Sequence, residues 1–242
     1  MCTVTFIPTG NSGFVLTSNR DEAPNRETSL PDFHTIDNTK MLFPKDTLAG
    51  GTWIGVSEKQ RMACLLNGGF TIHERKANYR MSRGVIVKDA LATNDVVKTL
   101  NDYDLCDIEP FTLIVVEWDA GLQLFELVWD GKQKHLSSLP IASRLWSSSS
   151  LYNESMKMER QNWFSDFLNY DDLSSDSLLE FHRTAGNGNL DFGVVMDRGF
   201  VKTTSMTQIK RSEKGIIMYY HDLVNDEQSQ TNFDISQVVN EK

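Results

Sequence analysis

The sequence predicts an α+β fold in which two antiparallel sheets and two pairs of helices form a single domain over residues 1–242. The segments run in the order strands, helix pair, strands, helix pair, strands, so every sheet face and apolar helix stripe can find an apolar partner. Apart from four serines at 147–150, no repeat, linker or low-complexity block divides the chain. With 242 residues, 40% of them hydrophobic, the chain can bury one substantial core.

The first element is a β-hairpin. Residues 3–7 (TVTFI) alternate and are rich in β-branched types, which is typical of a strand. The stretch Gly10-Asn11-Ser12-Gly13 has turn composition, and residues 14–18 (FVLTS) form the returning strand.

The next segment, residues 24–46, contains prolines and little periodicity, which predicts a long loop. A second hairpin follows, formed by TWIGVS (52–57) and RMACLLN (61–67). The turn sequence Asn67-Gly68-Gly69 closes it.

The remaining segments complete the alternation. Ser82 is a helix N-cap for RGVIVKDALAT, and Asn94 starts a second helix, DVVKTLNDY. Two strongly apolar strands, FTLIVVEW and LQLFELVW, meet at the turn Asp119-Ala120-Gly121. A helix over 153–169 is predicted from apolar residues that share one face: Met156, Trp163, Phe164, Phe167 and Leu168. A shorter helix (SLLEFHRTA) and a last strand pair (TTSMTQIK and GIIMYYHD) end the series.

Composition excludes several functional classes. A net charge of −9, from 24 basic and 33 acidic residues, argues against nucleic acid as a partner. No apolar run reaches the roughly 20 residues of a membrane span, and no secretory signal precedes the first strand. The five histidines and three cysteines lack metal-ligand or CxxC spacing, so we expect no metal, no disulfide framework and a reducing cytoplasm.

The first hairpin determines what lies near Cys2. With a two-residue turn or a four-residue loop, Cys2 opposes Asn19, and Asp21 lies on the diagonal, roughly 7–8 Å away. This register predicts that Cys2, Asn19 and Asp21 share one face of the ribbon.

Cys2 has the chemistry of an N-terminal nucleophile. Removal of Met1 would leave a free α-amine, with a reference pKa of about 7.7–8.0, beside a thiol of about 8.5. One residue would then supply both nucleophile and base. Asp21 would hold the amine, while Arg20 would favour the thiolate or bind an anionic substrate.

These residues carry a family resemblance. Met-Cys followed by Asn19-Arg20-Asp21-Glu22 resembles the NRDE family, also called the transport and Golgi organisation protein 2 family. The likeness continues through GGTWIGV (50–56), LLNGG (65–69), SRG (82–84) and SSSSL (147–151). It implies the four-layer αββα sandwich of N-terminal nucleophile hydrolases.

More distantly, the chain resembles the choloylglycine and penicillin V acylases of that superfamily. Their pattern implies Cys2 as nucleophile, Asp21 as the carboxylate that holds the amine, and Asn67 as an oxyanion-hole donor. The chain departs from the pattern at Ser18, which replaces an arginine, and at Ser147, which aligns with their second oxyanion asparagine. Arg211 is the candidate counterpart of the C-terminal arginine of these acylases.

Two functions follow from these patterns. The first is a cysteine hydrolase that cleaves an amide or related acyl bond of a small molecule, with Cys2, Asp21 and Asn67 catalytic and with Asn19, Arg20 and Ser147 binding substrate. It requires no cofactor. The alternative, implied by the family resemblance, is a non-catalytic carrier of haem or a lipid-like ligand on the same fold. A purely structural role has no sequence feature in its favour, and oligomeric state is left open.

Overall fold

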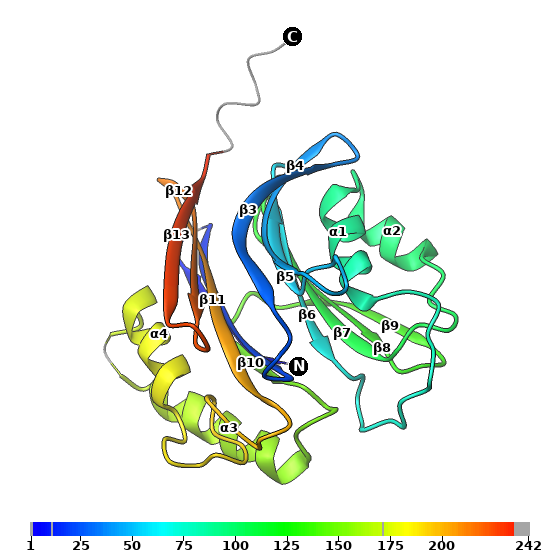
Figure 1. The fold of residues 1–242 in the computed structure, drawn as a ribbon. Coiled ribbons are helices and arrows are strands. Elements are labelled where there is room, and N and C mark those ends of the chain that lie inside the picture. Colours follow the sequence, from blue (N-terminus) through cyan, green and yellow to red (C-terminus); the bar gives the residue numbers. More distant parts are fainter. Residues whose placement is uncertain (1, 11, 171, 235–242) are drawn as a thin grey trace. The chain divides into compact units, whose positions relative to one another are not determined.

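The computed structural model describes residues 2–10, 12–170 and 172–234, and for Cys2 it describes the backbone. The chain divides into two compact units, one made of residues 1–26 and 142–231 and the other of residues 27–141 and 232–242. Each unit is built around one antiparallel sheet with a pair of helices (Figure 1). The predicted α+β class is therefore confirmed, while the single domain over residues 1–242 stays a prediction.

The first unit contains the sheet that begins the chain. Its strand order is β10-β1-β2-β11-β12-β13, so β1 lies inside the sheet between β10 and β2. The strands are β1 (Cys2–Thr9), β2 (Gly13–Glu22), β10 (Arg144–Ser147), β11 (Lys202–Ser212), β12 (Gly215–Asp222) and β13 (Glu227–Phe233). Helices α3 (Glu154–Phe167) and α4 (Ser175–Thr184) lie along one face of this sheet (Figure 1).

The register of the first hairpin differs from the prediction by one residue. β1 ends at Thr9 and β2 begins at Gly13, so three residues connect the strands. Cys2 therefore pairs with Arg20, and Thr3 pairs with Asn19. The prediction was wrong because it assumed an even-numbered connection. An odd-numbered one shifts every pair by one and exchanges the faces.

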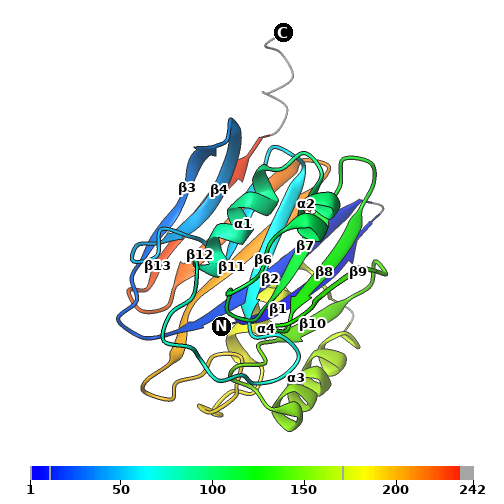
Figure 2. The same ribbon diagram turned by 90° about the vertical axis from the view of Figure 1, so that its right-hand side faces the viewer.

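The second unit contains a seven-stranded sheet in simple sequential order, β3 to β9. The strands are β3 (Thr28–Ile36), β4 (Thr39–Asp46), β5 (Ile54–Ser57), β6 (Arg61–Asn67), β7 (Phe111–Glu117), β8 (Gln123–Trp129) and β9 (Lys134–Leu139). Helices α1 (Arg83–Ala92) and α2 (Val96–Asp102) lie over one face of it (Figure 2). Asp95 caps α2, one residue after the predicted start.

The predicted loop over residues 24–46 is wrong, because β3 and β4 form a hairpin there. Asp37 and Asn38 both have positive φ, as the two central residues of a tight type I′ hairpin turn require. β3 is an edge strand, where Pro31 removes no hydrogen bond from the interior of the sheet. The ladder is also irregular between Ser29 and Asp32, which masked the alternation in the sequence.

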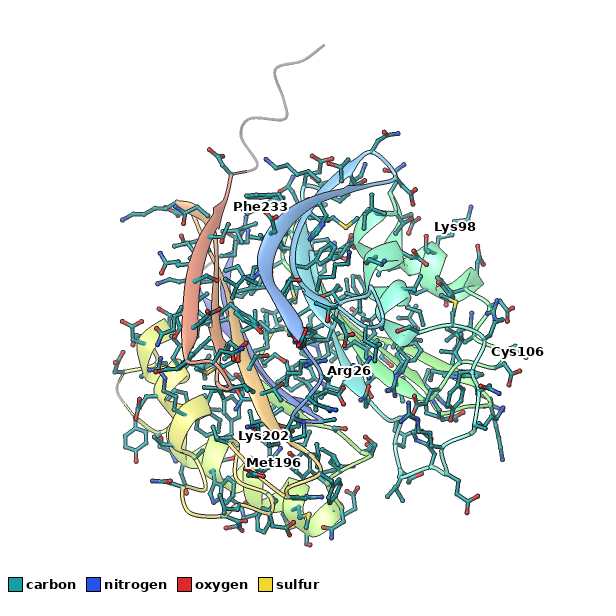
Figure 3. All side chains as sticks on the ribbon, viewed as in Figure 1. Arg26, Lys98, Cys106, Met196, Lys202 and Phe233 are labelled. Carbon is teal, nitrogen blue, oxygen red and sulfur yellow. The ribbon has the colours of Figure 1, made fainter. Side chains whose placement is uncertain are left out.

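Each unit has its own apolar core between its sheet and its helices. In the first unit Ile7, Val15 and Leu145 of the sheet pack with Phe164, Phe167, Leu178 and Phe181 of the helices. In the second, α1 and α2 pack on β4, β6, β7 and β8 through buried residues that include Val87, Leu91 and Leu113. Two residues outside these cores can be located in Figure 3. Phe233 ends β13, and Cys106 lies exposed in the connection after α2.

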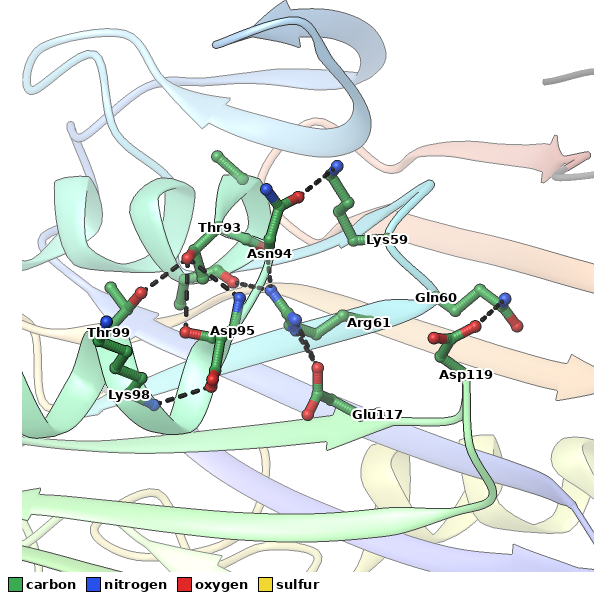
Figure 4. A network of polar contacts seen from close by, with 12 residues as sticks. Lys59, Gln60, Arg61, Thr93, Asn94, Asp95, Lys98, Thr99, Glu117 and Asp119 are labelled. Carbon is green, nitrogen blue, oxygen red and sulfur yellow. Dashed lines mark hydrogen bonds and ion pairs between the residues drawn. The ribbon is translucent and has the colours of Figure 1, made fainter. Parts of the chain in front are cut away.

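Arg61 joins three elements of the second unit (Figure 4). Its guanidinium donates to the carbonyls of Ala90 and Thr93 at 2.7 and 2.8 Å, where α1 ends, and forms an ion pair with Glu117 of β7. The unpaired carbonyls at a helix C-terminus attract a cation, so this buried arginine secures α1 to the sheet.

Candidate active site

The Asn19-Arg20-Asp21 motif is divided between the two faces of β2. Successive side chains of a strand point to opposite faces, and directly paired residues share a face. Arg20 therefore shares a face with position 2, whereas Asn19 and Asp21 lie on the face covered by α3 and α4. The Cys2 side chain lies outside the part of the chain that the structure describes.

Arg20 is a buried, charged residue on the face of position 2. It is 3% exposed, and its guanidinium lies 3.8 Å from the carboxylate of Glu22. It also donates to the Thr204 hydroxyl at 3.4 Å, where β11 departs from regular pairing with β2. A buried guanidinium beside position 2 suits two tasks, favouring a thiolate and holding an anionic group.

Asp21 is completely buried on the opposite face. Tyr152 donates its hydroxyl hydrogen bond to Oδ2 at 2.6 Å, and Thr203 donates to Oδ1 at 2.7 Å. Burial raises the pKa of this carboxyl above its ordinary value, while the positive charge of Arg160 and these two hydrogen bonds oppose the rise. Burial likewise raises the pKa of Tyr152, so Tyr152 remains a donor at neutral pH.

Arg160 supplies a positive charge that opposes the effect of burial on Asp21. This buried side chain of α3 donates to the carbonyls of Phe192 and Gly193 at 2.8 and 2.7 Å, and to the hydroxyl of Thr3. Its guanidinium also lies 3.6 Å from the centroid of the Tyr152 ring, a cation–π contact. Its many partners stabilise a charge that would otherwise be costly to bury.

Asn19 and His182 form a second buried pair beside Asp21. The Asn19 amide donates to the carbonyls of His182 and Val194 at 2.9 and 2.7 Å, so its oxygen faces His182 Nδ1 at 2.8 Å. Nδ1 must therefore carry the proton, and Nε2 accepts from the Thr5 hydroxyl at 2.8 Å. Burial and Arg160 lower the pKa of His182 to about 3, so the imidazole is neutral at pH 7.

The other predicted site residues are more dispersed. Ser147 ends β10 opposite Thr3, on the face away from Arg20, and its buried hydroxyl has no partner among the described residues. Asn67 ends β6 in the second unit, opposite Phe111. Arg211 pairs with Phe14 near the start of β2, and its guanidinium donates a hydrogen bond to the carbonyl of Ser12. It therefore lies at the opposite end of β2 from Arg20. The expectation that Arg211 joins the site is therefore not supported.

Four buried residues around Asp21 and Asn19 were not predicted from the sequence: Tyr152, Arg160, Thr203 and His182. A signal existed for Arg160, because it lies four residues after Met156 and four before Phe164, on the apolar face of α3. A lone arginine in such a stripe indicates a buried cation, and a buried cation requires an anionic or polar partner. No local pattern could identify Tyr152 or Thr203, which reach Asp21 from 131 and 182 residues away in sequence.

The described residues contain neither a metal site nor a membrane-crossing helix. Over residues 2–10, 12–170 and 172–234, no cluster of three or more histidine, cysteine, aspartate or glutamate side chains has the arrangement of a metal site. Within the same residues, every helix is too short or too polar to span a bilayer.

Comparisons with known proteins agree with the fold and the motif. A family model described as Transport and Golgi organisation 2 matches residues 1–186. No curated protein sequence matches the chain.

Three solved structures illustrate the structural likeness. A variant of conjugated bile acid hydrolase from Clostridium perfringens superposes with a TM-score of 0.62 at 13% identity, covering 97% of this chain and 94% of that one. For penicillin V acylase from Agrobacterium tumefaciens the TM-score is 0.58 at 9% identity, with 96% and 86% covered. For the Caenorhabditis elegans orthologue of N-acylethanolamine-hydrolyzing acid amidase it is 0.58 at 10% identity, with 86% and 92% covered. At these identities the likeness shows the fold alone, which is the predicted N-terminal nucleophile hydrolase fold.

Proposed function

This chain belongs to the Transport and Golgi organisation 2 family, and on that premise we propose that it is an N-terminal-nucleophile cysteine hydrolase. The substrate would be a small molecule with an amide or related acyl bond. One observation carries the proposal. A cysteine at position 2 begins an interior strand of the sheet and pairs with a buried arginine, within a fold similar to that of a conjugated bile acid hydrolase and an acid amidase.

The proposed chemistry begins with loss of Met1. The α-amine of Cys2 takes the thiol proton, and the thiolate attacks the substrate carbonyl carbon to give a tetrahedral oxyanion. Collapse breaks the carbon–nitrogen bond, and the protonated amine returns its proton to the leaving nitrogen. Water then hydrolyses the thioester, with the same amine as base. The acid is released and the thiol is restored.

The neighbouring residues take roles that fit the observed register. Arg20, on the face of position 2, would favour the thiolate and orient an anionic group of the substrate. Asp21 follows the partner of Cys2 in β2, so we propose that it acts on the amine at the start of the strand rather than on the thiol. Three further roles stay predictions: Asn67 as an oxyanion donor, and Asn19 and Ser147 as substrate-binding residues.

The test combines intact mass with alkylation by iodoacetamide. The mature chain should lack Met1. Its Cys2 should be alkylated at pH 6.5 at least about tenfold faster than a free cysteine, because only about 1% of an ordinary thiol is ionised there.

The Cys106→Ala background removes the exposed competing thiol, and peptide mapping locates the label. Cys2→Ala in the same background should lose the fast label. A retained Met1, or fast labelling that persists without Cys2, would eliminate this mechanism.

The carrier of haem or a lipid-like ligand is kept as the alternative, because a shared fold at 9–13% identity does not establish chemistry. Saturable haem binding that survives Cys2→Ala, together with slow Cys2 alkylation, would favour the carrier. We further propose a cytoplasmic location. The exposed Cys106 supports it, because a solvent-accessible thiol persists in a reducing compartment.

A further inference from the structure

A groove lies between helices α3 and α4 of the first unit, on a part of the molecule that the proposed hydrolase chemistry does not use. Its cavity volume is about 590 Å³, within the range of small-molecule sites. The lining includes four aromatic side chains: Trp163, Phe167, Tyr170 and Phe181. Phe167 and Phe181 are buried, with ring centroids 5.2 Å apart, and belong to the apolar core.

The aromatic wall is held in place before any ligand arrives. Trp163 stacks on Phe192 with an interplanar angle of 2° and a centroid separation of 5.8 Å. Gly186 also lies close to this ring, because an added Cβ there would be 2.3 Å from the indole. Gly186 also has a φ of +69°, so glycine suits both the backbone and the close approach of the ring. Because the Trp163 ring is already fixed, little side-chain entropy is lost when a ligand packs in the groove.

The rim of the groove is acidic. Asp166 of α3, Glu180 of α4 and Asp172 are lining residues, and the lining contains no lysine, arginine or histidine among the described residues. Asp172 already accepts two hydrogen bonds from Ser174, which caps α4, so it has a structural role. The carboxylate of Glu180 lies 3.8 Å from the guanidinium of Arg183, one turn further along α4, in a loose and exposed ion pair. Asp166 and Glu180 therefore remain able to interact with a ligand.

We propose that this groove binds an amphipathic organic cation, an amine or quaternary ammonium with an apolar body. The body lies against Phe167 and Phe181, and the cationic head lies between the carboxylates of Asp166 and Glu180. Aromatic faces and carboxylates both attract a cation, and both repel an anion. The combination selects for charge sign as well as for apolar area. The site lies wholly within the first unit and is independent of Cys2.

Calorimetric titration with two matched probes tests the proposal. The first probe is 4-phenylbutyltrimethylammonium, and the second is 4-phenylbutanesulfonate, which has the same body and the opposite charge. The full chain should bind the cation saturably at one site and at least about tenfold more tightly than the sulfonate. The preference should weaken as ionic strength rises.

Two charge-matched double variants locate the site. Asp166→Asn with Glu180→Gln should weaken binding of the cation about tenfold. Glu159→Gln with Asp176→Asn changes the net charge equally on the same two helices outside the groove, and should leave affinity unchanged. Tyr170→Leu should also lower the affinity for the cation. It should leave thermal stability unaltered, because the Tyr170 side chain is 68% exposed. Equal affinity for the two probes, equal losses in the two double variants, or no saturable binding would each overturn the proposal.

Discussion

At the scale of single residues, the side chains of the motif Asn19-Arg20-Asp21 lie in two different environments, one on each face of β2. Arg20 lies on the face of position 2, while Asn19 and Asp21 are held on the other face. There Tyr152 and Thr203 donate hydrogen bonds to Asp21. Consecutive residues of a strand cannot share a face. A motif that is contiguous in sequence thus places one residue on the face of position 2 and two on the face that packs against the helical layer.

His182 gives this anchor a pH dependence. Its pKa is about 3 in the folded state against 6.5 when unperturbed, so the unfolded chain takes up the proton first as pH falls. Stability from this group is fully present above pH 6.5 and decreases by about 1.4 kcal/mol per unit below it. Between pH 6.5 and 5 the free energy of unfolding should fall by about 2 kcal/mol from His182 alone.

Urea unfolding of the wild type and of His182→Gln at both pH values measures this difference. Because the pKa of Asp21 is raised, Asp21 makes the free energy of unfolding change with pH in the opposite direction. It does so in both proteins, so the difference between them isolates His182. An unchanged slope in His182→Gln would contradict the assignment.

At the scale of elements, the strands that the sequence analysis missed are mainly edges. β3, β9, β10 and β13 are the outer strands of the two sheets, and all four went unpredicted. Edge strands are often polar, irregular or short, which limits unwanted pairing and also removes the apolar alternation that marks a strand. The interior strands and all four described helices were predicted, with the exception of β4, which the prolines of its segment concealed.

The motifs GGTW and SRG have a shared structural cause at this scale. A Cβ on Gly84, at the start of α1, would lie 2.9 Å from the carbonyl oxygen of Thr52, and one on Gly51 would lie 3.0 Å from the Gly84 Cα. The helix therefore packs directly on backbone. Gly84→Ala should lower the free energy of unfolding by about 1–3 kcal/mol, although alanine alone favours a helix by about 1 kcal/mol.

Thermal and urea unfolding check the sign of this change. Gly84→Ser should cost more than Gly84→Ala, since the clash grows with the side chain. Gln161→Ala, at an exposed position of α3, should stay within about 0.5 kcal/mol of the wild type. A stabilised Gly84→Ala protein would show that the backbone at Thr52 moves away without cost.

At the scale of the whole molecule, the two units are interrupted in sequence. The first unit combines residues 1–26 with 142–231, so its sheet cannot be completed until the chain has passed through residues 27–141. Such an arrangement favours cooperative folding of the entire chain. This is the physical basis on which we retain the prediction of a single domain.

Calorimetry tests that prediction. The wild type should unfold in one transition with equal calorimetric and van't Hoff enthalpies. Leu178→Ala in the first core and Leu113→Ala in the second should each cost about 2–5 kcal/mol and shift the whole transition downward. A second transition that stays in place when one core is weakened would mean that the units unfold independently.

The sequence by itself determined the fold class, most interior strands, the helices, and the motif by which the family is recognised. These features depend on residues close together in the chain, through alternation, capping and helical periodicity. The tertiary structure alone decided which face each motif residue occupies and which partners surround Asp21. The physical reasons are specific. One extra residue in the connection after Thr9 exchanges the faces of β1, and Tyr152, Arg160 and Thr203 reach the site only when distant segments pack on one sheet.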